Sequence, residues 1–324
     1  MIESLGTLAF ELVFELLLAS ALVWVVVGII TRFLGITDAA WRARFFLLPL
    51  LLPVFAVPLL HVLIRPLFLG MPSTPLENFL IFLAGFSPLT AWVSLGIVGF
   101  LLFSGAIHTL RPIVAASLLR LSWQRQCHRK SPVWLRCNST LQSISVKMEI
   151  SHARLVLTES NFCGSVTVGP LGSYVVISRA LFSLLDDEEL ETLLAHELGH
   201  IRKKDTLLDV VVGVCQRLMA ISPFAQSASR RFFQAREEAI DDLAIRASGH
   251  PLALASCLVK ARRLSLGQLR YMPISGLLMS ESAIDSRIRR LLEKTTNDAK
   301  PSRWYIGAFC GVIAVIATFL LFMV

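Results

Sequence analysis

The sequence predicts an α-helical membrane protein that carries an α+β domain between its membrane-spanning segments. Of its 324 residues, 55% are hydrophobic and only 17% are charged, and the mean hydropathy of +0.66 is too high for an ordinary soluble protein. Long apolar runs lie near both ends of the chain. About 190 residues between them have the mixed patterning of a globular domain that can form its own core. A strong helical pattern in this domain, at residues 184–194, leads into His196-Glu197-Leu198-Gly199-His200.

About four membrane-spanning helices are expected, at residues 11–30, 45–64, 89–110 and 304–324. The second tolerates Pro53 and Pro58, because neighbouring helices compensate for prolines in a membrane. Residues 76–86 are apolar but too short to cross. Glu11 and Glu15 lie within the first span, where acidic side chains are functional candidates. Their place near its outer end favours the simpler interpretation that they reach the interface.

The distribution of basic residues predicts the orientation. Residues 66–110 contain no Lys or Arg, whereas residues 111–136 contain six basic residues and no acid. The positive-inside rule then places the region after the third span in the cytoplasm. We therefore expect an N-terminal membrane region with three helices, a cytoplasmic domain and a C-terminal membrane helix in the cytoplasmic (inner) cell membrane. Their predicted boundaries are residues 1–113, 114–303 and 304–324.

The net charge of +8 could indicate a nucleic-acid partner. The basic residues flank apolar spans, however, and the sequence shows no nucleic-acid-binding motif. The lipid bilayer is therefore the expected partner, and nucleic acid is not.

A further apolar stretch, residues 206–223, tests this topology. A single span there would place His196 and His200 on the opposite side of the membrane from the residues that follow. Two spans do not fit between His200 and Glu237, because each needs about 20 residues and a turn. The stretch is therefore predicted to be a buried or membrane-skirting helix of the domain.

The His-Glu-x-x-His motif predicts a zinc site. His196 and His200 are four residues apart, so on a helix they project from one face, about 40° apart around the axis. Glu197 follows the first histidine and can take a proton from a water at the metal. The alternative is a chance match, since a five-residue motif has a real false-positive rate. A third ligand would decide between them.

The third ligand is expected in the helical segment at residues 236–244. Glu237 and Asp241 lie four residues apart on one face, so that the glutamate can bind metal while the aspartate orients a ligand histidine. Glu238 and Asp242 have the same spacing, and position alone does not choose between the pairs. The alternative is a solvated acidic patch that pairs with the nearby Arg230, Arg231 and Arg236.

With these residues in view, the chain resembles the integral-membrane gluzincins of the BlaR/MecR antirepressor type. Residues 190–205 and 236–242 carry the likeness, and the HtpX and CAAX-prenyl-protease type is similar to a lesser degree. The resemblance implies Glu237 as the third ligand, with Asp241 in support. It also implies three spans, a cytoplasmic metallopeptidase domain and one further span. HtpX-type enzymes place two spans between the histidines and the glutamate, for which there is no room here. Antirepressor sensors continue beyond the last span, whereas this chain stops at Val324, so antibiotic sensing is not expected.

Arg287 carries a weaker signal. It resembles an arginine that helps to bind the oxyanion in the prenyl-protease type, but Glu281 stands where that family has histidine. Phosphate-headgroup or surface contacts are an equal alternative for Arg287.

Asp205 is expected to have a structural role. On a continued helix it would lie about 180° from His196, so a salt bridge with Arg202 or Lys203 is preferred.

Residues 165–168 and 174–178 are predicted to form a small hairpin beside the zinc helix. In gluzincins an edge strand before this helix binds substrate by strand addition. A purely structural sheet is an equal alternative.

These observations predict a zinc-dependent endopeptidase that cuts polypeptide on the cytoplasmic side. One Zn²⁺ per chain would be bound by His196, His200 and Glu237, with Glu197 as the base. The expected role is regulated proteolysis or signalling, with a transcriptional repressor or a membrane protein as substrate. The alternatives are HtpX-like quality control of membrane proteins and a transducer without proteolytic activity. The sequence carries no signal for an oligomeric state.

Overall fold

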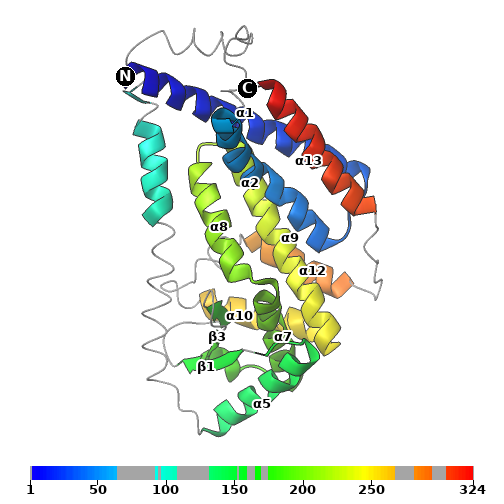
Figure 1. Ribbon diagram of the computed structural model, residues 1–324. Helices are drawn as coiled ribbons and strands as arrows, with labels where there is room; N and C mark the ends of the chain where they lie inside the picture. The colour runs from blue at the N-terminus through cyan, green and yellow to red at the C-terminus, as the bar shows by residue number, and fades with distance from the viewer. Residues whose placement is uncertain are drawn as a thin grey trace. The chain divides into compact units, whose positions relative to one another are not determined.

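The computed structural model describes nine stretches of the chain: residues 2–63, 92–93, 96–107, 131–151, 153–158, 165–168, 174–266, 281–293 and 304–323 (Figure 1). The chain divides into two compact units. The first unit consists of Met1–Leu110, Val211–Phe232 and Ala299–Val324. The second unit consists of Arg111–Val210 and Phe233–Asp298. Helices α8 (Asp205–Leu218) and α9 (Pro223–Ser248) each have residues in both units.

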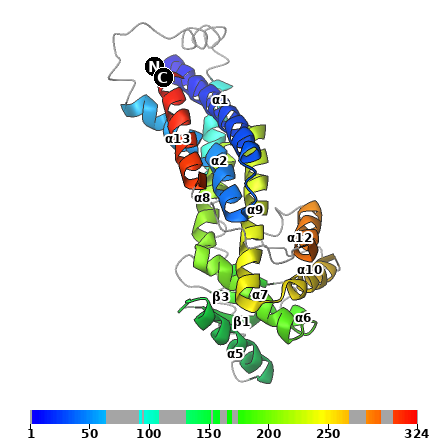
Figure 2. The same cartoon turned by 90° about the vertical axis from the view of Figure 1, so that its right-hand side faces the viewer.

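The first unit contains helices α1 (Ile2–Phe33), α2 (Ala39–Leu63) and α13 (Trp304–Met323), which contact one another (Figure 2). Helix α1 is followed by Gly35, which has a positive φ of 55°, a conformation that suits glycine. Helix α2 starts where the Asp38 carboxylate accepts a hydrogen bond from the backbone N–H of Trp41, as an N-cap residue does.

Two helices among the described residues are long and apolar enough to cross a membrane, Phe10–Phe33 and Ala39–Leu59. They correspond to the first two predicted spans, and the second begins earlier than predicted. Two further apolar helices, Gly96–Ile107 and Trp304–Ile316, are shorter and fall within the other predicted spans. The predicted short apolar segment at residues 76–86 lies outside the described residues.

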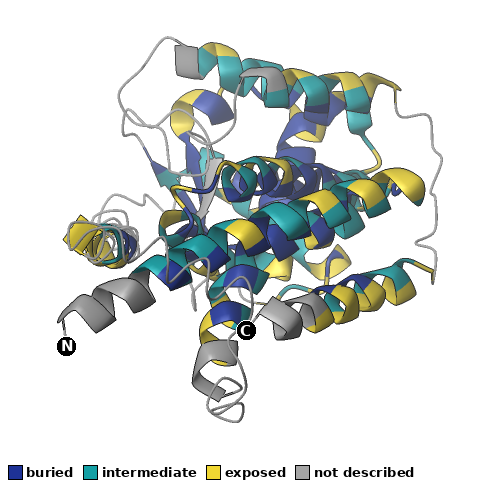
Figure 3. Cartoon of the chain, turned by 90° about the horizontal axis from the view of Figure 1, so that it is seen from above, coloured by how far each residue is buried: buried dark blue, intermediate teal, exposed yellow. Residues whose placement is uncertain are grey.

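The core of the first unit is apolar. Val23, Val27, Phe45, Val312 and Ile316 are each at most 1% exposed. Buried residues recur every three or four positions along α1, the helix that starts at the N-terminus in Figure 3. Such spacing is expected of a helix that presents one face to its neighbours.

Glu11 and Glu15 face the interior of the first unit, and their predicted position near the membrane interface stays a prediction. The two residues are only 6% and 7% exposed. They continue the line of buried residues that Ala19 and Val23 form along α1 at a spacing of four residues. Their helical phase directs them to the buried face, which their position along the span does not reveal.

Helix α8 occupies most of the apolar stretch at residues 206–223. Its 14 residues are too few to cross a membrane. Val212 and Cys215 are buried, whereas Leu207 is exposed, so one face of the helix packs and the other does not. The predicted helix is present, and its position relative to the membrane stays a prediction. Its residues from Val211 onward belong to the first unit.

The second unit contains a three-stranded sheet of order β1-β3-β2 and the helices that pack on it. The strands are β1 (Arg154–Thr158), β2 (Ser165–Val168) and β3 (Tyr174–Ser178). Strand β2 pairs antiparallel with β3, which confirms the predicted hairpin. Strand β1 pairs parallel with β3 and is an addition to that prediction. The described helices lying wholly in this unit are α5 (Pro132–Lys147), α6 (Arg179–Phe182), α7 (Asp187–Lys203), α10 (Pro251–Leu266) and α12 (Glu281–Glu293).

One hydrophobic core joins this sheet to helices α5, α7 and α10. Leu141, Ile177, Leu194, Leu198 and Leu254 are all at most 1% exposed and belong to one cluster. Full burial of such a side chain contributes about 1.5–3 kcal/mol to stability. Because α7 contributes Leu194 and Leu198, the core fixes the helix that carries the His-Glu-x-x-His motif.

Candidate metal centre

Helix α7 has a well-defined start. The Asp186 side chain accepts a hydrogen bond from the N–H of Glu189 at 2.8 Å, and the Glu189 side chain accepts one from the N–H of Asp186 at 3.0 Å. This reciprocal capping box satisfies two N–H groups at the helix end. Glu189 also accepts hydrogen bonds from Lys260 and Ser256 of α10, each at 2.6 Å. Burial raises the pKa of Glu189, but these contacts and the Lys260 charge outweigh it and lower the pKa below its usual value.

Helices α7 and α9 approach each other closely at the motif. A Cβ atom on Gly199 would lie 3.0 Å from Cγ2 of Ile240, which is 1% exposed. Glycine at the fourth position of the motif therefore allows α9 to lie against α7. This approach brings Glu237 to the two histidines.

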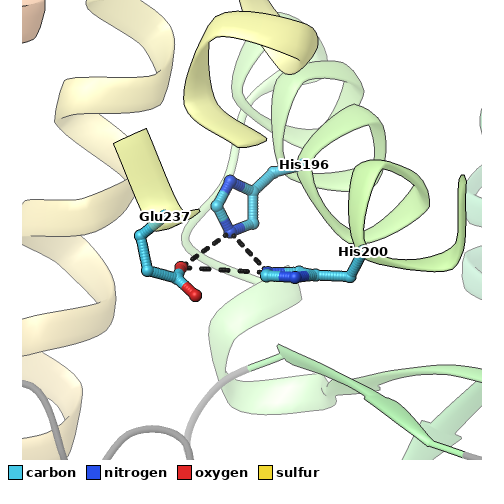
Figure 4. Close-up of side chains that lie close together, drawn as sticks. All are labelled: His196, His200 and Glu237. Atoms are coloured by element: carbon cyan, nitrogen blue, oxygen red, sulfur yellow. Dashed lines mark hydrogen bonds and ion pairs between the residues drawn. The ribbon is translucent and has the colours of Figure 1, made fainter. Parts of the chain in front are cut away.

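The side chains of His196, His200 and Glu237 meet in a triangle of possible ligand atoms (Figure 4). The two histidine Nε2 atoms lie 3.3 Å apart. The Oε2 atom of Glu237 lies 3.6 Å from Nε2 of His196 and 3.8 Å from Nε2 of His200. His196 and Glu237 are each 8% exposed, so the group is largely shielded from solvent.

The triangle fits a zinc ion. Zinc binds nitrogen and oxygen at about 2.0–2.2 Å, and neighbouring ligands in a tetrahedron of that size lie about 3.4 Å apart. The three observed separations lie close to this value. Two histidines and one glutamate are also an established ligand set for a catalytic zinc, with the fourth position left for water.

Asp205 lies against the second histidine of the motif, and the prediction that it pairs with Arg202 or Lys203 is wrong. Helix α7 ends at Lys203, and Lys204 adopts a left-handed conformation with a φ of 55°. This turn breaks the helical phase and brings the Asp205 carboxylate to 2.7 Å from Nδ1 of His200. A carboxylate on Nδ1 fixes the ring so that Nε2 faces the triangle.

Asp241 supports the first histidine in the same way. Its Oδ1 atom lies 3.0 Å from Nδ1 of His196, although the angle falls short of a well-directed hydrogen bond. Burial lowers the pKa of His196, but the contacts with Asp241 and Glu237 outweigh it and raise the pKa to about 9. Metal and proton compete for this ring, because a histidine binds metal in its neutral form.

Arg287 holds Asp241 in place. Its Nε and Nη2 atoms donate to the two carboxylate oxygens of Asp241 at 2.8 and 2.6 Å. Burial raises the pKa of Asp241, but the Arg287 charge and the contacts with His196 outweigh it and lower the pKa to about 2. Because Arg287 is 4% exposed, the alternative of surface contacts for this residue is wrong.

Arginines also flank Glu237. Nη1 of Arg287 lies 3.4 Å from Oε2, the oxygen that faces the histidines, and Nη2 of Arg236 lies 3.5 Å from Oε1. Burial raises the pKa of Glu237, but the surrounding positive charges and the contact with His196 hold it well below the usual range. Glu237 is therefore a carboxylate, the form that binds metal.

The structure separates the two acidic pairs that spacing alone does not. Glu238 and Asp242 lie with Arg290 of α12, which donates to Asp242 at 2.7 Å and lies 3.9 Å from Glu238. Glu237 and Asp241, in contrast, lie with the histidines. The alternative of a solvated acidic patch is wrong, because Glu237, Glu238 and Asp241 are all buried.

Arg236, named above as a partner of the neighbouring acids, also contacts two carboxylates outside its own helix, which the sequence does not indicate. Its guanidinium donates to the Asp209 carboxylate and lies 3.8 Å from the Asp205 carboxylate. It thus connects the start of α8 to α9, the helix that carries Glu237.

Glu197 is buried in α7 with 5% exposure, one residue after the first histidine.

The edge strand β2 contacts helix α7. The side chain of Glu281 is not among those described, although its backbone begins α12.

A His-Glu-x-x-His helix that meets a glutamate of a later helix, in a chain with apolar helices of spanning length, defines the class of membrane metallopeptidases. The comparison with protein families agrees. The chain belongs to the BlaR1 peptidase M56 family, whose model matches residues 12–291.

Several curated relatives carry the name "Protease HtpX homolog". The one from Pyrococcus abyssi is 27% identical over 139 residues, which cover 33% of this chain and 47% of that protein. The one from Dictyoglomus thermophilum is 36% identical over 100 residues, which cover 30% of this chain and 32% of that protein. The one from Acaryochloris marina is 24% identical over 206 residues, which cover 48% of this chain and 70% of that protein. The chain thus spans less than half the length of the first two.

Proposed function

We propose that this chain is a zinc-dependent endopeptidase that cuts polypeptide on the cytoplasmic side of the membrane. The proposal rests on the triangle of His196, His200 and Glu237, whose atoms are spaced as the ligands of one tetrahedral zinc are spaced. One zinc per chain would be held there. The membership in a membrane peptidase family supports the same assignment.

The chemistry follows from the residues around this triangle. Bound zinc would supply Lewis acidity, which lowers the pKa of water and polarises a carbonyl. Glu197 would take the proton from the water as the water oxygen attacks the carbonyl carbon of the scissile peptide. The same carboxyl group would then give the proton to the leaving nitrogen as the C–N bond breaks.

Asp205, Asp241 and Arg287 would act as positioning residues. The two aspartates orient the histidine rings through Nδ1, and Arg287 orients Asp241. Binding of the oxyanion by Arg287 remains a prediction. Two of its nitrogens are engaged with Asp241, and its Nη1 atom beside Glu237 is the group that would face a substrate.

The sheet offers a place for an extended substrate. Strand β2 is an edge strand and contacts α7, so a polypeptide added to its outer edge would run beside the motif helix. Backbone hydrogen bonds would then align substrates of different sequence. A purely structural role of the sheet is the alternative.

The replacement Glu197→Gln tests the mechanism. It preserves size but removes the base, so the full-length protein should bind one zinc per chain and fail to cut casein or itself. Zinc is measured by mass spectrometry, and cleavage is followed with and without a chelator. Cleavage at the wild-type rate by Glu197→Gln would overturn the proposal.

The biological substrate separates two enzyme roles. By resemblance, the first is regulated proteolysis of a transcriptional repressor or a partner membrane protein. The relatives named "Protease HtpX homolog" favour a second, the quality control of membrane proteins. Substrate trapping with Glu197→Gln distinguishes the two roles. Regulated proteolysis predicts that one protein dominates the trapped material, whereas quality control predicts many misfolded proteins. A zinc-binding wild type that cuts nothing would indicate a transducer without proteolytic activity.

A further inference from the structure

A basic pocket of the second unit is lined by residues other than those of the triangle. Its volume is about 480 Å³, and its lining comes from α5, α7, α9 and the residue after α5: Lys147, Met148, Arg202, Lys203, Leu243, Arg246 and Ala247. Four of these residues are cationic and none is acidic. The other three are apolar, and Met148 is only 2% exposed.

The cations gather because three helices end at this pocket. Lys147 lies in the last turn of α5, Lys203 in the last turn of α7 and Arg246 in the last turn of α9. A cation near a helix C-terminus is stabilising, because it offsets the partial negative charge there. This effect alone would account for one cation at each helix end.

The concave shape of the pocket and its fourth cation are not explained by stabilisation of the helix ends alone. Arg202 adds a second cation to the last turn of α7, and the described residues of the lining include no carboxylate. Lys147 pairs with Glu191 at 2.8 Å, but that glutamate lies outside the lining. Cations from three helices therefore border one concave space, and such a space concentrates positive potential and attracts anions.

We propose that this pocket binds a phosphate-bearing anion, either the headgroup of an anionic phospholipid or a soluble organic phosphate. Its volume lies within the range of about 300–1,000 Å³ for small-molecule sites, which is larger than a lone inorganic phosphate requires. Arg202 and Arg246 can each present a planar guanidinium to phosphate oxygens. The apolar side chains of Met148 and Leu243 would contact the carbon part of the ligand.

The binding test uses the purified full-length protein in a non-ionic detergent. The probes are dioctanoyl-phosphatidylglycerol, dioctanoyl-phosphatidylcholine and sn-glycerol 3-phosphate, followed by microscale thermophoresis. Arg202→Glu and Arg246→Glu each reverse one charge of the pocket. Arg263→Glu makes the same reversal at an exposed position of α10 outside the lining, and so provides the matched control.

The wild type should bind phosphatidylglycerol more tightly than phosphatidylcholine. Each pocket variant should weaken this binding about tenfold, and Arg263→Glu should leave it unchanged. Zinc content and circular dichroism equal to wild type show that a variant is folded. Glycerol phosphate that binds with the same dependence on Arg202 and Arg246 identifies a soluble ligand, whereas binding of the anionic lipid alone identifies a headgroup.

Three results would overturn the proposal. The first is that neither phosphatidylglycerol nor glycerol phosphate binds. The second is that folded pocket variants bind as strongly as the wild type. The third is that Arg263→Glu loses as much binding as the pocket variants do. Because none of these measurements involves cleavage, the proposal fails or holds independently of the peptidase activity.

Discussion

The two units bury polar groups in different ways. In the second unit, charged residues are buried and paired: Arg287 pairs with the buried Asp241, and the buried Glu189 pairs with the half-buried Lys260. In the first unit, the core cluster is apolar and aromatic, Glu11 and Glu15 of α1 are buried near one end of it, and a buried hydrogen bond joins the neutral hydroxyls of Ser20 and Ser222 at 2.6 Å.

This difference reflects what each unit has to achieve. Helices α1, α2 and α13 pack mainly through apolar contacts, with Glu11 and Glu15 as buried exceptions on α1. The candidate metal centre needs two rings and a carboxylate at fixed positions, which paired charges can provide. Buried charges are costly when one partner is removed, because the other is left without compensation. The loss of one such group should therefore destabilise the second unit far more than the loss of a serine hydroxyl destabilises the first.

Arg287→Ala should have the largest effect on stability. It leaves Asp241, which is fully buried at 0% exposure, without its bidentate partner. Breaking a buried pair in this way costs about 3–5 kcal/mol. Chemical denaturation of the full-length protein in detergent measures the change. A loss below about 1 kcal/mol would show that the pair is as dispensable as a surface one.

Glu189→Ala should cost about 2–3 kcal/mol, since it removes the side-chain half of the capping box that Glu189 supplies, together with the contact with Lys260. Because the pKa of Glu189 is lowered by folding, its carboxylate stabilises the folded state fully above the ordinary value of 4.5. This contribution is lost as the pH falls from that value through the lower pKa of the folded state. Denaturation at neutral and at acidic pH should therefore give a smaller difference between wild type and Glu189→Ala in acid. A difference that does not depend on pH would contradict this account.

Gly199→Ala should cost about 1–2 kcal/mol, because the added methyl group meets Cγ2 of Ile240 at 3.0 Å. It should also weaken zinc binding by moving α9, which carries Glu237. The second change Ile240→Ala removes the opposing methyl group. The double variant should therefore lose less stability than the two single losses predict, and additive losses would argue against this contact.

Ser20→Ala should have the smallest effect, about 0.5–1 kcal/mol, which is usual for a hydrogen bond between neutral groups. Ser222→Ala should cost more, because Ser222 also accepts a hydrogen bond from the N–H of Ala225 at the start of α9. The same denaturation assay compares the two variants. A loss for Ser20→Ala that approaches that of Arg287→Ala would abolish the contrast between the units.

The elements with strong local patterns could be predicted from the sequence. The motif helix and the β2–β3 hairpin appear where periodicity and turn residues place them. Strand β1 escapes prediction because Leu155, Val156 and Leu157 form a short apolar run that fits a strand or a buried helix equally well. Helix α5 is also absent from the prediction, although Ser131 and Pro132 are a typical helix start.

The candidate site was predictable up to the point where side chains from distant segments meet. Spacing places His196 and His200 on one face, but only the resemblance selects Glu237 over Glu238. The packing of α12 explains that selection, since Arg290 takes Glu238 and Asp242 while Arg287 takes Asp241. Asp205 is misplaced by helical periodicity because a single left-handed residue, Lys204, ends α7 directly before it.

X-ray absorption at the zinc edge tests the central claim most directly. The full-length protein should contain one zinc per chain with two imidazole nitrogens and a carboxylate oxygen as protein ligands. In Glu237→Gln the imidazole signal should persist while affinity falls, and in His200→Ala one imidazole should disappear. Zinc bound by sulfur, or a zinc signal unchanged in both variants, would contradict the assignment of this site.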